Sequence, residues 1–361
     1  IQKSGGWTFG SPSVLMMFYR APGELQSELQ EMDECMPHYY KITNGHGQGA
    51  ETIMRAEADF MRACFADAQI MLERAYAQID GNGQENMALC CDFLAWRLSL
   101  CTSFTPRESF EQRREALLGL HNVAWLNILQ SSCAYYYALL GLPEKIPAVF
   151  REHQLASIHF LAPGKPMMEL IENQVYLAQG EYAKVIGHSE ALLGMCEAMH
   201  YALVALHIRL QTAAAYEMLG KRETADELLI SALAAAEPDA LYLPFVENYR
   251  YLKTALTRGA GAKFAAFVRT VTPLGEDFVR RCGEKRAEGS RPAALAGLTE
   301  RESAIAALVA KRLSNREIAE QLFLSEGSVK QYINQIYSKL LITGDVRTKR
   351  KRLAELAAPK S

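Results

Sequence analysis

The sequence predicts an all-α protein, in which a solenoid of paired helices is followed by a smaller helical domain. Apolar residues recur at helical spacing over most of the 361 residues. Turns recur at an almost constant interval between these helices, and helix-capping signals divide the C-terminal part of the chain. Strand signals are few, and only residues 7–9 and 14–19 have a pattern that also fits an extended segment.

Length and composition are those of a globular protein with two or three domains. Hydrophobic residues make up 49% of the chain and charged residues 22%. No apolar run approaches the ~18 residues that a membrane span needs, so we expect no membrane partner. The chain begins with no signal-peptide pattern. Because its first residue is Ile1 and not Met, we treat it as a candidate fragment.

The eight cysteines are scattered along the chain and form no C-x-x-C pair. Most of them lie among apolar residues in helical stretches, where a reduced thiol behaves as a small hydrophobic side chain. A disulfide framework is typical of short secreted chains and not of a chain of this length. We therefore expect a reducing, cytoplasmic setting.

Charge is distributed unevenly between the two ends of the chain. Residues 298–361 hold twelve basic and seven acidic side chains, a net charge of +5, whereas residues 1–297 carry −7. A basic module on an acidic body indicates a polyanion partner for that module. Residues 282–297 are rich in Gly, Ala and charge and show no apolar period, so they predict a linker between domains at 1–281 and 298–361.

The helical stretch before the linker is repetitive. Gly141, Gly180 and Gly220 are spaced by 39 and 40 residues, and Ala63 lies two steps of 39 before Gly141. Each position follows an apparent helix end and precedes a second helical pattern. This spacing favours a helical-pair solenoid, in which each pair buries its face against its neighbours. The alternative is a helical bundle without repeats.

The repeats resemble tetratricopeptide repeats, in the long-period version found in the sensor region of MalT-like regulators. The characteristic turn is clean only at Gly180-Glu181-Tyr182. The resemblance implies a region that senses an effector, either a small molecule or a partner protein, in the concave groove of the solenoid. MalT-like regulators also carry a nucleotide-binding domain before the repeats, and the sequence does not decide whether such a domain has been removed here.

Three capping signals divide residues 298–342. Thr299-x-x-Glu302 and Ser314-x-x-Glu317 are capping boxes, and Ser325 is a third N-cap. They predict helices near 300–312, 315–323 and 326–341. Because only two residues separate the second helix from the third, the pattern is that of a helix-turn-helix.

The third of these helices has two distinct faces. Its apolar stripe consists of Val329, Ile333, Ile336 and Leu340. The opposite face offers amide, hydroxyl and lysine groups without an acid, and it contains Gly327, Gln331, Asn334, Ser338 and, on its shoulder, Lys330. Such a face can enter a DNA major groove, where Gln and Asn pair with adenine and Lys with guanine. The alternative is a solvated surface helix.

At this point the sequence is similar to the LuxR-type helix-turn-helix. The residues that match its pattern are Leu298, Thr299, Arg301, Glu302, Ser314, Asn315, Arg316, Glu317, Ile318, Ala319, Leu322, Ser325, Val329, Lys330, Lys339, Leu340 and Ile342. The resemblance implies a four-helix module whose last helix is 347–357. It implies base contacts from Lys330, Gln331 and Asn334. It implies phosphate contacts from Ser314, Asn315, Arg316, Ser325, Ser328, Lys339 and Arg347.

The chain departs from the family pattern at several positions. Ser303 replaces a usual acid, Arg312 a usual Gly, Ser328 a usual Thr and Tyr332 a usual His. The family's Ser-Arg pair after Ile342 is also replaced, which puts dimerisation through the final helix in doubt. The five basic residues in 347–352 either grip phosphate or form a solvated helix end.

The sequence indicates no further catalytic, cofactor or metal site. No phosphate-binding glycine loop and no nucleophile motif is present, and His200 and His207 are too far apart along a helix to share a metal without further ligands. We therefore expect no enzyme activity, no cofactor and no metal.

The sequence predicts a sequence-specific, DNA-binding transcriptional regulator whose partners are double-stranded DNA and an effector, with a homo-oligomer on DNA as a further expectation. One alternative is a protein-interaction adaptor, in which the terminal module is a docking surface. The other is an enzyme with an unrecognised site in residues 1–281.

Overall fold

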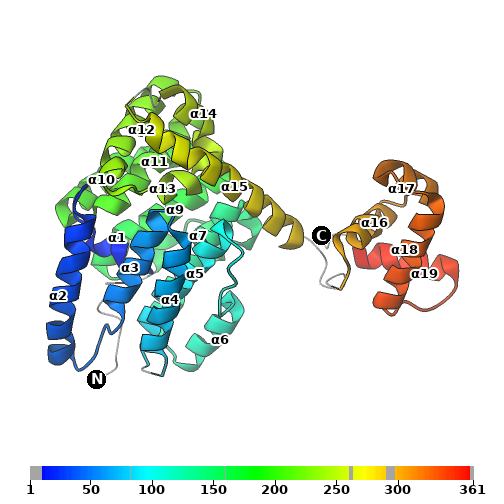
Figure 1. The fold of residues 1–361 in the computed structure, drawn as a ribbon, viewed down its shortest axis with the longest axis horizontal. Coiled ribbons are helices and arrows are strands. Elements are labelled where there is room, and N and C mark those ends of the chain that lie inside the picture. The colour runs from blue at the N-terminus through cyan, green and yellow to red at the C-terminus, as the bar shows by residue number, and fades with distance from the viewer. Residues whose placement is uncertain (1–9, 82, 159, 260–262, 290–296, 358–361) are drawn as a thin grey trace. The chain divides into compact units, whose positions relative to one another are not determined.

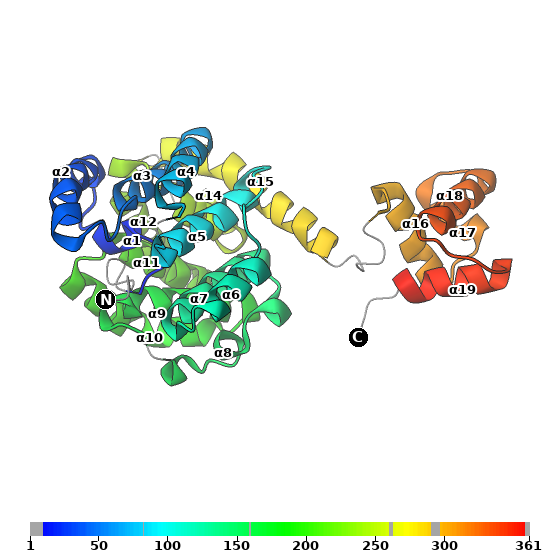
Figure 2. The ribbon, with the colours of Figure 1, turned by 90° about the horizontal axis from the view of Figure 1, so that it is seen from below.

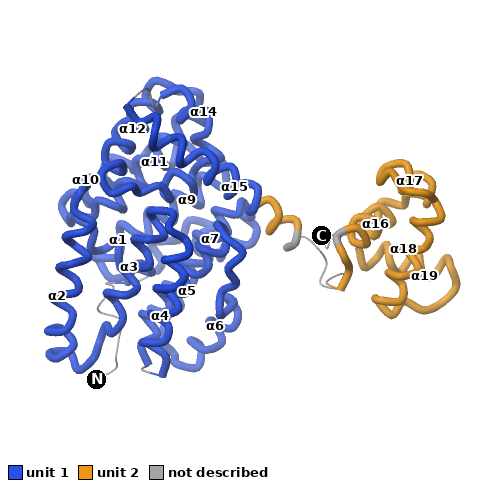
Figure 3. Tube along the Cα trace, in the orientation of Figure 1, with its two compact units in different colours: residues 1–282 blue, residues 283–361 orange. Residues whose placement is uncertain are grey.

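Helices make up the regular structure of the chain (Figure 1). The computed structural model describes residues 10–81, 83–158, 160–259, 263–289 and 297–357, and it contains no strand within them. The all-α prediction is therefore confirmed. Of the two segments with an extended pattern, residues 7–9 lie outside the described residues, and the other contains the short helix α1. The chain divides into two units, residues 1–282 and 283–361 (Figure 3).

Fifteen α-helices lie in the described part of the first unit or begin there. Their bounds are α1 Leu15–Phe18, α2 Leu25–Thr43, α3 Ala50–Met61, α4 Phe65–Ile79, α5 Glu85–Cys101, α6 Phe110–Gly119, α7 Val123–Leu140, α8 Ala148–Arg151, α9 Lys165–Gln179, α10 Tyr182–Met199, α11 Ala202–Met218, α12 Arg222–Ala236, α13 Leu243–Glu247, α14 Tyr249–Gly259 and α15 Ala265–Gly289. Short 3₁₀ helices lie at Pro143–Lys145, Leu155–Ser157, Ala162–Gly164 and Glu237–Asp239.

Left-handed backbone is found at each position that the repeat spacing singles out. Gly180 ends α9 with φ 78°, Gly220 joins α11 to α12 with φ 74°, and Ala63 joins α3 to α4 with φ 60°. Glycine adopts this conformation at little cost, and alanine does so with strain. At these three places the chain reverses into a second full-length helix, and the two helices of each pair pack against each other.

No full-length helix follows directly after Gly141, in contrast to the other three positions. This glycine ends α7 with φ 72°, as expected, but only a 3₁₀ turn and the four-residue α8 follow it before α9 begins. As a result α7 packs directly against α9. Figure 2 shows α6 and α7 side by side, and α3, α4 and α5 next to one another.

The helices near the start of the first unit are joined to the segment from α11 to α13. The short helix α13 packs against α3, and the N–H of Tyr242 donates to the carbonyl of Met61 at 2.8 Å. The Tyr19 hydroxyl donates to Asp239 at 2.7 Å, and the N–H of Ala202 donates to the carbonyl of Tyr19 at 3.0 Å. These hydrogen bonds therefore hold together segments that are about 180 residues or more apart in sequence.

A buried ion pair lies beside the contact between α3 and α13. Nε of Arg97, on α5, is 2.8 Å from Oε1 of Glu247, on α13, and both side chains are 1% exposed. The Tyr135 hydroxyl donates to the same carboxylate at 2.8 Å. The Arg97 guanidinium also lies over the rings of Phe60 and Phe93, 4.9 and 5.2 Å from their centroids. These contacts tie α3, α5, α7 and α13 together.

The second unit contains four helices in its described residues after the linker: α16 Glu300–Ala310, α17 Asn315–Leu322, α18 Glu326–Lys339 and α19 Val346–Ala357. The predicted linker differs from the structure in part, because α15 continues to Gly289 and residues 282–289 are helical. Residues 290–296 of the linker lie outside the described residues.

We expect the Arg97–Glu247 pair to be a strong determinant of stability in the first unit. Replacing one partner, as in Arg97→Met, leaves a buried charge unpaired and should lower the free energy of unfolding by about 3–5 kcal/mol. All three tryptophans precede residue 126. Urea denaturation followed by tryptophan fluorescence therefore reports on this unit alone.

Two further variants control this measurement. Lys253→Met removes one partner of the exposed Lys253–Glu276 pair and should change the free energy far less than Arg97→Met does, because solvent screens exposed charges. The double variant Arg97→Met/Glu247→Leu should be less destabilised than Arg97→Met, since no unpaired charge remains. Equal losses in Arg97→Met and Lys253→Met would contradict the importance of the buried pair.

Candidate nucleic-acid interface

Each helix of the predicted helix-turn-helix starts at the capping residue that the sequence indicates. Thr299 and Ser314 form complete capping boxes with Glu302 and Glu317, at the starts of α16 and α17. The Ser325 hydroxyl accepts the N–H of Ser328 at the start of α18. Side chain and backbone satisfy each other at these helix starts, so the caps fix where the helices begin. This part of the prediction is confirmed.

The turn between α17 and α18 is one residue longer than predicted. α17 ends at Leu322, and Phe323 adopts a left-handed conformation with φ 52° and a 95% exposed side chain. Arg312, which stands where the family pattern has Gly, also has positive φ, at 64°. A glycine would adopt either conformation without strain. The sequence signals the positive φ of Arg312, because the family pattern has Gly at that position. The predicted helix bounds alone do not show it.

The apolar stripe of α18 packs in the core of the second unit. Val329, Ile333 and Ile336 are buried, whereas Leu340 is half-buried at the edge of the same core. Their buried partners from the other helices are Ile305, Val309, Ile318 and Leu353. Since one side of α18 is held in this way, its opposite side faces outward.

The outward side of α18 forms one wall of an open hollow of about 870 Å³. The three residues predicted to read bases, Lys330, Gln331 and Asn334, all line it and are exposed. The complete lining is Glu302, Gly327, Lys330, Gln331, Asn334, Gln335, Ser338 and Lys339. The structure therefore brings the predicted base-reading residues together, along with Gln335 and Glu302, which the sequence analysis missed.

Glu302 adds an acidic group to the hollow, although the outward face of α18 itself has none, as predicted. It comes from α16, and its carboxylate accepts a hydrogen bond from the Lys339 ammonium at 2.7 Å. The same oxygen accepts the N–H of Thr299 at 2.7 Å. The ion pair neutralises Glu302 and fixes the end of α18 against the start of α16. Lys339, predicted to contact phosphate, thus also has a structural partner within the domain.

The other residues predicted to contact phosphate lie at the starts of helices and do not line the hollow. Ser314 caps α17, and Arg316 beside it pairs with Glu320 at 3.2 Å. The Asn315 carbonyl oxygen accepts Nη1 of Arg350 from α19 at 2.7 Å. The amide side chain of Asn315 is therefore already used to attach α19 to this corner.

A second group of predicted phosphate contacts lies at the starts of α18 and α19. The hydroxyls of Ser325 and Ser328 are 2.8 Å apart, and Ser325 is exposed. Arg347 is exposed near the start of α19. The N-terminus of a helix attracts anions because its N–H groups point outward and its dipole is positive there. The starts of α17 and α18 thus combine backbone donors with hydroxyl groups.

The basic helix α19 docks through Leu353 and Ala357, which are buried against α16. Of its five basic residues, Arg347, Lys351 and Arg352 are exposed, whereas Lys349 and Arg350 are half-buried. Lys351 lies 3.9 Å from Glu355. Most of the positive charge on this helix is therefore accessible to an external anion.

The described residues of the first unit contain no group of three or more His, Cys, Asp or Glu placed to hold a metal ion. His207 is fully buried, whereas His200 is exposed at the end of α10, so the two do not form one site. All eight cysteines are free thiols. Among the described helices, none has the length and apolar character that crossing a bilayer requires.

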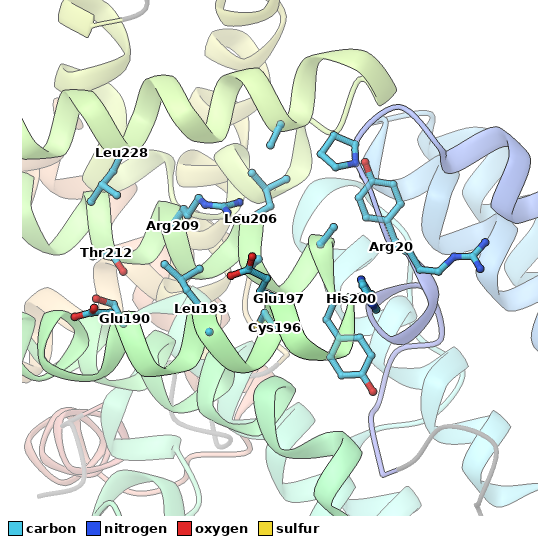
Figure 4. Close-up of a pocket in the computed structure, with 18 of the residues that line it drawn as sticks. Arg20, Glu190, Leu193, Cys196, Glu197, His200, Leu206, Arg209, Thr212 and Leu228 are labelled. Atoms are coloured by element: carbon cyan, nitrogen blue, oxygen red, sulfur yellow. The ribbon is translucent and has the colours of Figure 1, made fainter.

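The first unit contains hollows of its own. A groove of about 860 Å³ is lined by residues from α10, α11, α12 and the segment after α1 (Figure 4). Its labelled lining includes Glu197 and Arg209, on the facing helices α10 and α11, and leads to His200 and Arg20. A smaller cavity adjoins it, because Arg20 and His200 line both.

Comparison with known proteins places the second unit in a family. Residues 296–350 match the family described as bacterial regulatory proteins, luxR family. The C-terminal part of the chain is thus a luxR-family helix-turn-helix domain.

Two relatives match short segments of this chain. The transcriptional regulatory protein LnrK of Bacillus subtilis is 41% identical over 63 residues, which are 16% of this chain and 29% of the relative. The DNA-binding transcriptional activator DevR/DosR of Mycobacterium tuberculosis is 39% identical over 46 residues, 13% of this chain and 21% of that protein. The chain thus spans less than a third of either relative. No solved structure matches it.

The Glu302–Lys339 pair predicts an acid-sensitive second unit. Burial raises the pKa of Glu302, but hydrogen bonds from Lys339 and Thr299 outweigh burial and hold this pKa below its usual 4.5. A carboxyl with a lowered pKa stabilises the fold above its usual pKa, and this stabilisation is lost as the pH falls through that range. We expect Glu302→Gln to lower stability at neutral pH and to flatten the loss between about pH 5 and 3.

Isoleucine methyl signals of Ile305, Ile333 and Ile336 in the intact chain would report urea unfolding of this unit by NMR. Glu355→Gln is the matched control, since Glu355 is exposed and 3.9 Å from its partner Lys351. Identical pH profiles for the wild type and Glu302→Gln would show that the pair contributes nothing.

Proposed function

We propose that this protein is a transcriptional regulator that binds duplex DNA sequence-specifically, with α18 in the major groove. The observation that carries the proposal is the arrangement of α18. Its apolar side is buried, and its opposite side presents Lys330, Gln331 and Asn334 in one open hollow. Both relatives that the chain matches are described as transcriptional proteins, and one as DNA-binding.

The exposed side chains suit the edges of base pairs. The amides of Gln331, Asn334 and Gln335 each offer a donor and an acceptor, as pairing with the N6 and N7 atoms of adenine requires. The Lys330 ammonium is a donor for the acceptors of guanine. Because Lys339 neutralises Glu302, the only acid lining the hollow does not add an unpaired negative charge to this surface.

The phosphate contacts would come from the starts of α17 and α18 and from α19. Ser314, Asn315 and Arg316 at the start of α17 would contact one phosphate group, and Ser325 and Ser328 at the start of α18 another. Arg347 and the exposed lysine and arginine residues of α19 would add sequence-independent, salt-sensitive affinity. Lys339 would reach phosphate with the donors that Glu302 leaves free, since an ammonium group has three.

For the first unit we propose a sensor role, on a scaffold of tetratricopeptide-like helical pairs. A small-molecule or protein effector would bind to the helical pairs and change how the DNA-binding domain is presented or paired on DNA. The hollows along α10–α12 and beside α1–α3 support a binding role. Between α5, α7 and α13 the space is filled by Arg97, Tyr135 and Glu247, so an effector would have to bind elsewhere.

Selection of bound DNA from a random duplex pool at fixed salt tests the proposed function. We expect the full chain to enrich a defined motif, and Asn334→Ala to relax it at one or two positions at a cost of about 1–3 kcal/mol. Gln26→Ala, an exposed glutamine on α2, is the matched control and should leave the motif unchanged.

Absence of an enriched motif, or salt-sensitive binding that ignores sequence, would contradict sequence-specific reading. The adaptor alternative makes the opposite prediction, since a docking surface does not need base-reading side chains. If Lys330→Ala and Asn334→Ala both leave the protein's function in cells intact, the adaptor alternative is favoured over the DNA-binding regulator.

A further inference from the structure

A cavity of about 340 Å³ lies in the first unit, beside the groove of Figure 4. It is formed by α1, α2, α3, the end of α10 and the segment after α1. Its lining is Met17, Phe18, Arg20, Glu28, Glu31, Met32, Cys35, Met54, Met199 and His200. The volume falls in the ~300–1,000 Å³ range of small-molecule sites.

The walls of this cavity are apolar and adaptable. Four methionines contribute to them, of which Met17, Met32 and Met54 are buried and Met199 is half-buried. Thioether side chains are flexible and polarisable, and they pack against ligands of irregular shape. Phe18 adds an aromatic ring. Such walls favour an aliphatic or aromatic body over a polar one.

One carboxylate oxygen in the lining has no hydrogen-bond donor. Oε1 of Glu28 accepts the N–H of Arg20 at 2.7 Å, but Oε2 is buried and accepts nothing from the described residues. The whole residue is only 3% exposed. Because a buried acceptor without a donor is costly, a donor that reached this oxygen from the cavity would be stabilising.

The charges around the cavity indicate the sign of that donor. Glu28 and Glu31 are both paired with the single guanidinium of Arg20, so these three side chains, when ionised, carry one negative charge in excess. Burial of Glu28 raises its pKa, and a cation bound beside it would favour the ionised form. An anionic ligand would be repelled by these carboxylates and therefore disfavoured.

We propose that this cavity, which we call the methionine cavity, binds a small apolar amine in its ammonium form. The apolar body would lie among the methionines, and the ammonium would donate to Oε2 of Glu28. The amine site deepens the proposed function, because the bound amine would act as the effector of the DNA-binding domain. Only this effector role rests on the proposed function. Binding itself does not depend on DNA.

Two cysteines of the chain allow binding to be measured directly. Cys35 and Cys64 are both exposed, but only Cys35 lines the methionine cavity. The probe is n-octylammonium, compared with n-octanol and octanoate of the same chain length. The readout is the rate at which N-ethylmaleimide alkylates each cysteine in the full chain, resolved by peptide mass spectrometry.

We expect n-octylammonium to slow alkylation of Cys35 and leave Cys64 unchanged. Half-protection should need a roughly tenfold lower concentration of n-octylammonium than of n-octanol, because a hydrogen bond to a charged group is stronger than a neutral one. Octanoate should not protect. Equal protection by all three probes, stronger protection by octanoate, or simultaneous protection of Cys64 would overturn the proposal.

Three variants locate the interaction. Glu28→Gln should remove the preference for n-octylammonium over n-octanol, whereas Glu34→Gln, an exposed residue on the same helix outside the cavity, should retain it. Met199→Trp narrows the cavity without touching Glu28 and should abolish protection even if Glu28→Gln folds poorly. Retained preference in Glu28→Gln would overturn the proposal.

Selection of DNA by the same preparation separates the two proposals. Protection of Cys35 without an enriched motif would refute the regulator and leave the amine site standing. An enriched motif without protection would do the reverse.

Discussion

The arrangement of the first unit depends on the burial of one ion pair between residues 150 positions apart. Arg97 reaches Glu247 from α5 to α13, and Tyr135 on α7 donates to the same carboxylate. Two charges are stable in such a place only when each finds its partner and most of its hydrogen bonds. The pair therefore specifies which helices meet, and it holds α13 against the earlier helices. This closure fills the space between α5, α7 and α13 and leaves α10–α12 and α1–α3 to form the hollows.

In the second unit the equivalent constraint is the burial of one side of α18. Helix α18 can bury Val329, Ile333 and Ile336 only by presenting Gln331 and Asn334 on the other side, because a helix repeats every 3.6 residues. Glu302 then holds the end of the helix through Lys339. Folding and the presentation of the polar face thus result from the same packing.

Features of this chain that are local in sequence could be predicted, and those that depend on distant partners could not. The caps at Thr299, Ser314 and Ser325 lie within three residues of the groups that they bind, so their signals are complete in the sequence. Glu302–Lys339 and Asn315–Arg350 join residues 37 and 35 positions apart, and nothing local indicates them. Gln335 is exposed and lies one helical turn after Gln331, so helical periodicity does indicate it and the sequence analysis overlooked it.

The predicted linker shows a second limit. Residues 282–289 lack an apolar period, which is why they were expected to be irregular, yet they are helical. Alanine, glutamate, lysine and arginine in this segment are good helix formers, and they extend a helix that earlier residues have started. Amphipathic spacing identifies helices that pack on a core, and it does not identify a helical segment that lacks such spacing.

Methylation interference on the selected duplex tests the central claim, the entry of α18 into the major groove, most directly. Dimethyl sulfate methylates N7 of guanine in the major groove and N3 of adenine in the minor groove. The account predicts that N7 methylation within the motif prevents binding by the full chain, whereas N3 methylation has little effect. Interference confined to N3, or none at either position, would contradict a major-groove role for α18.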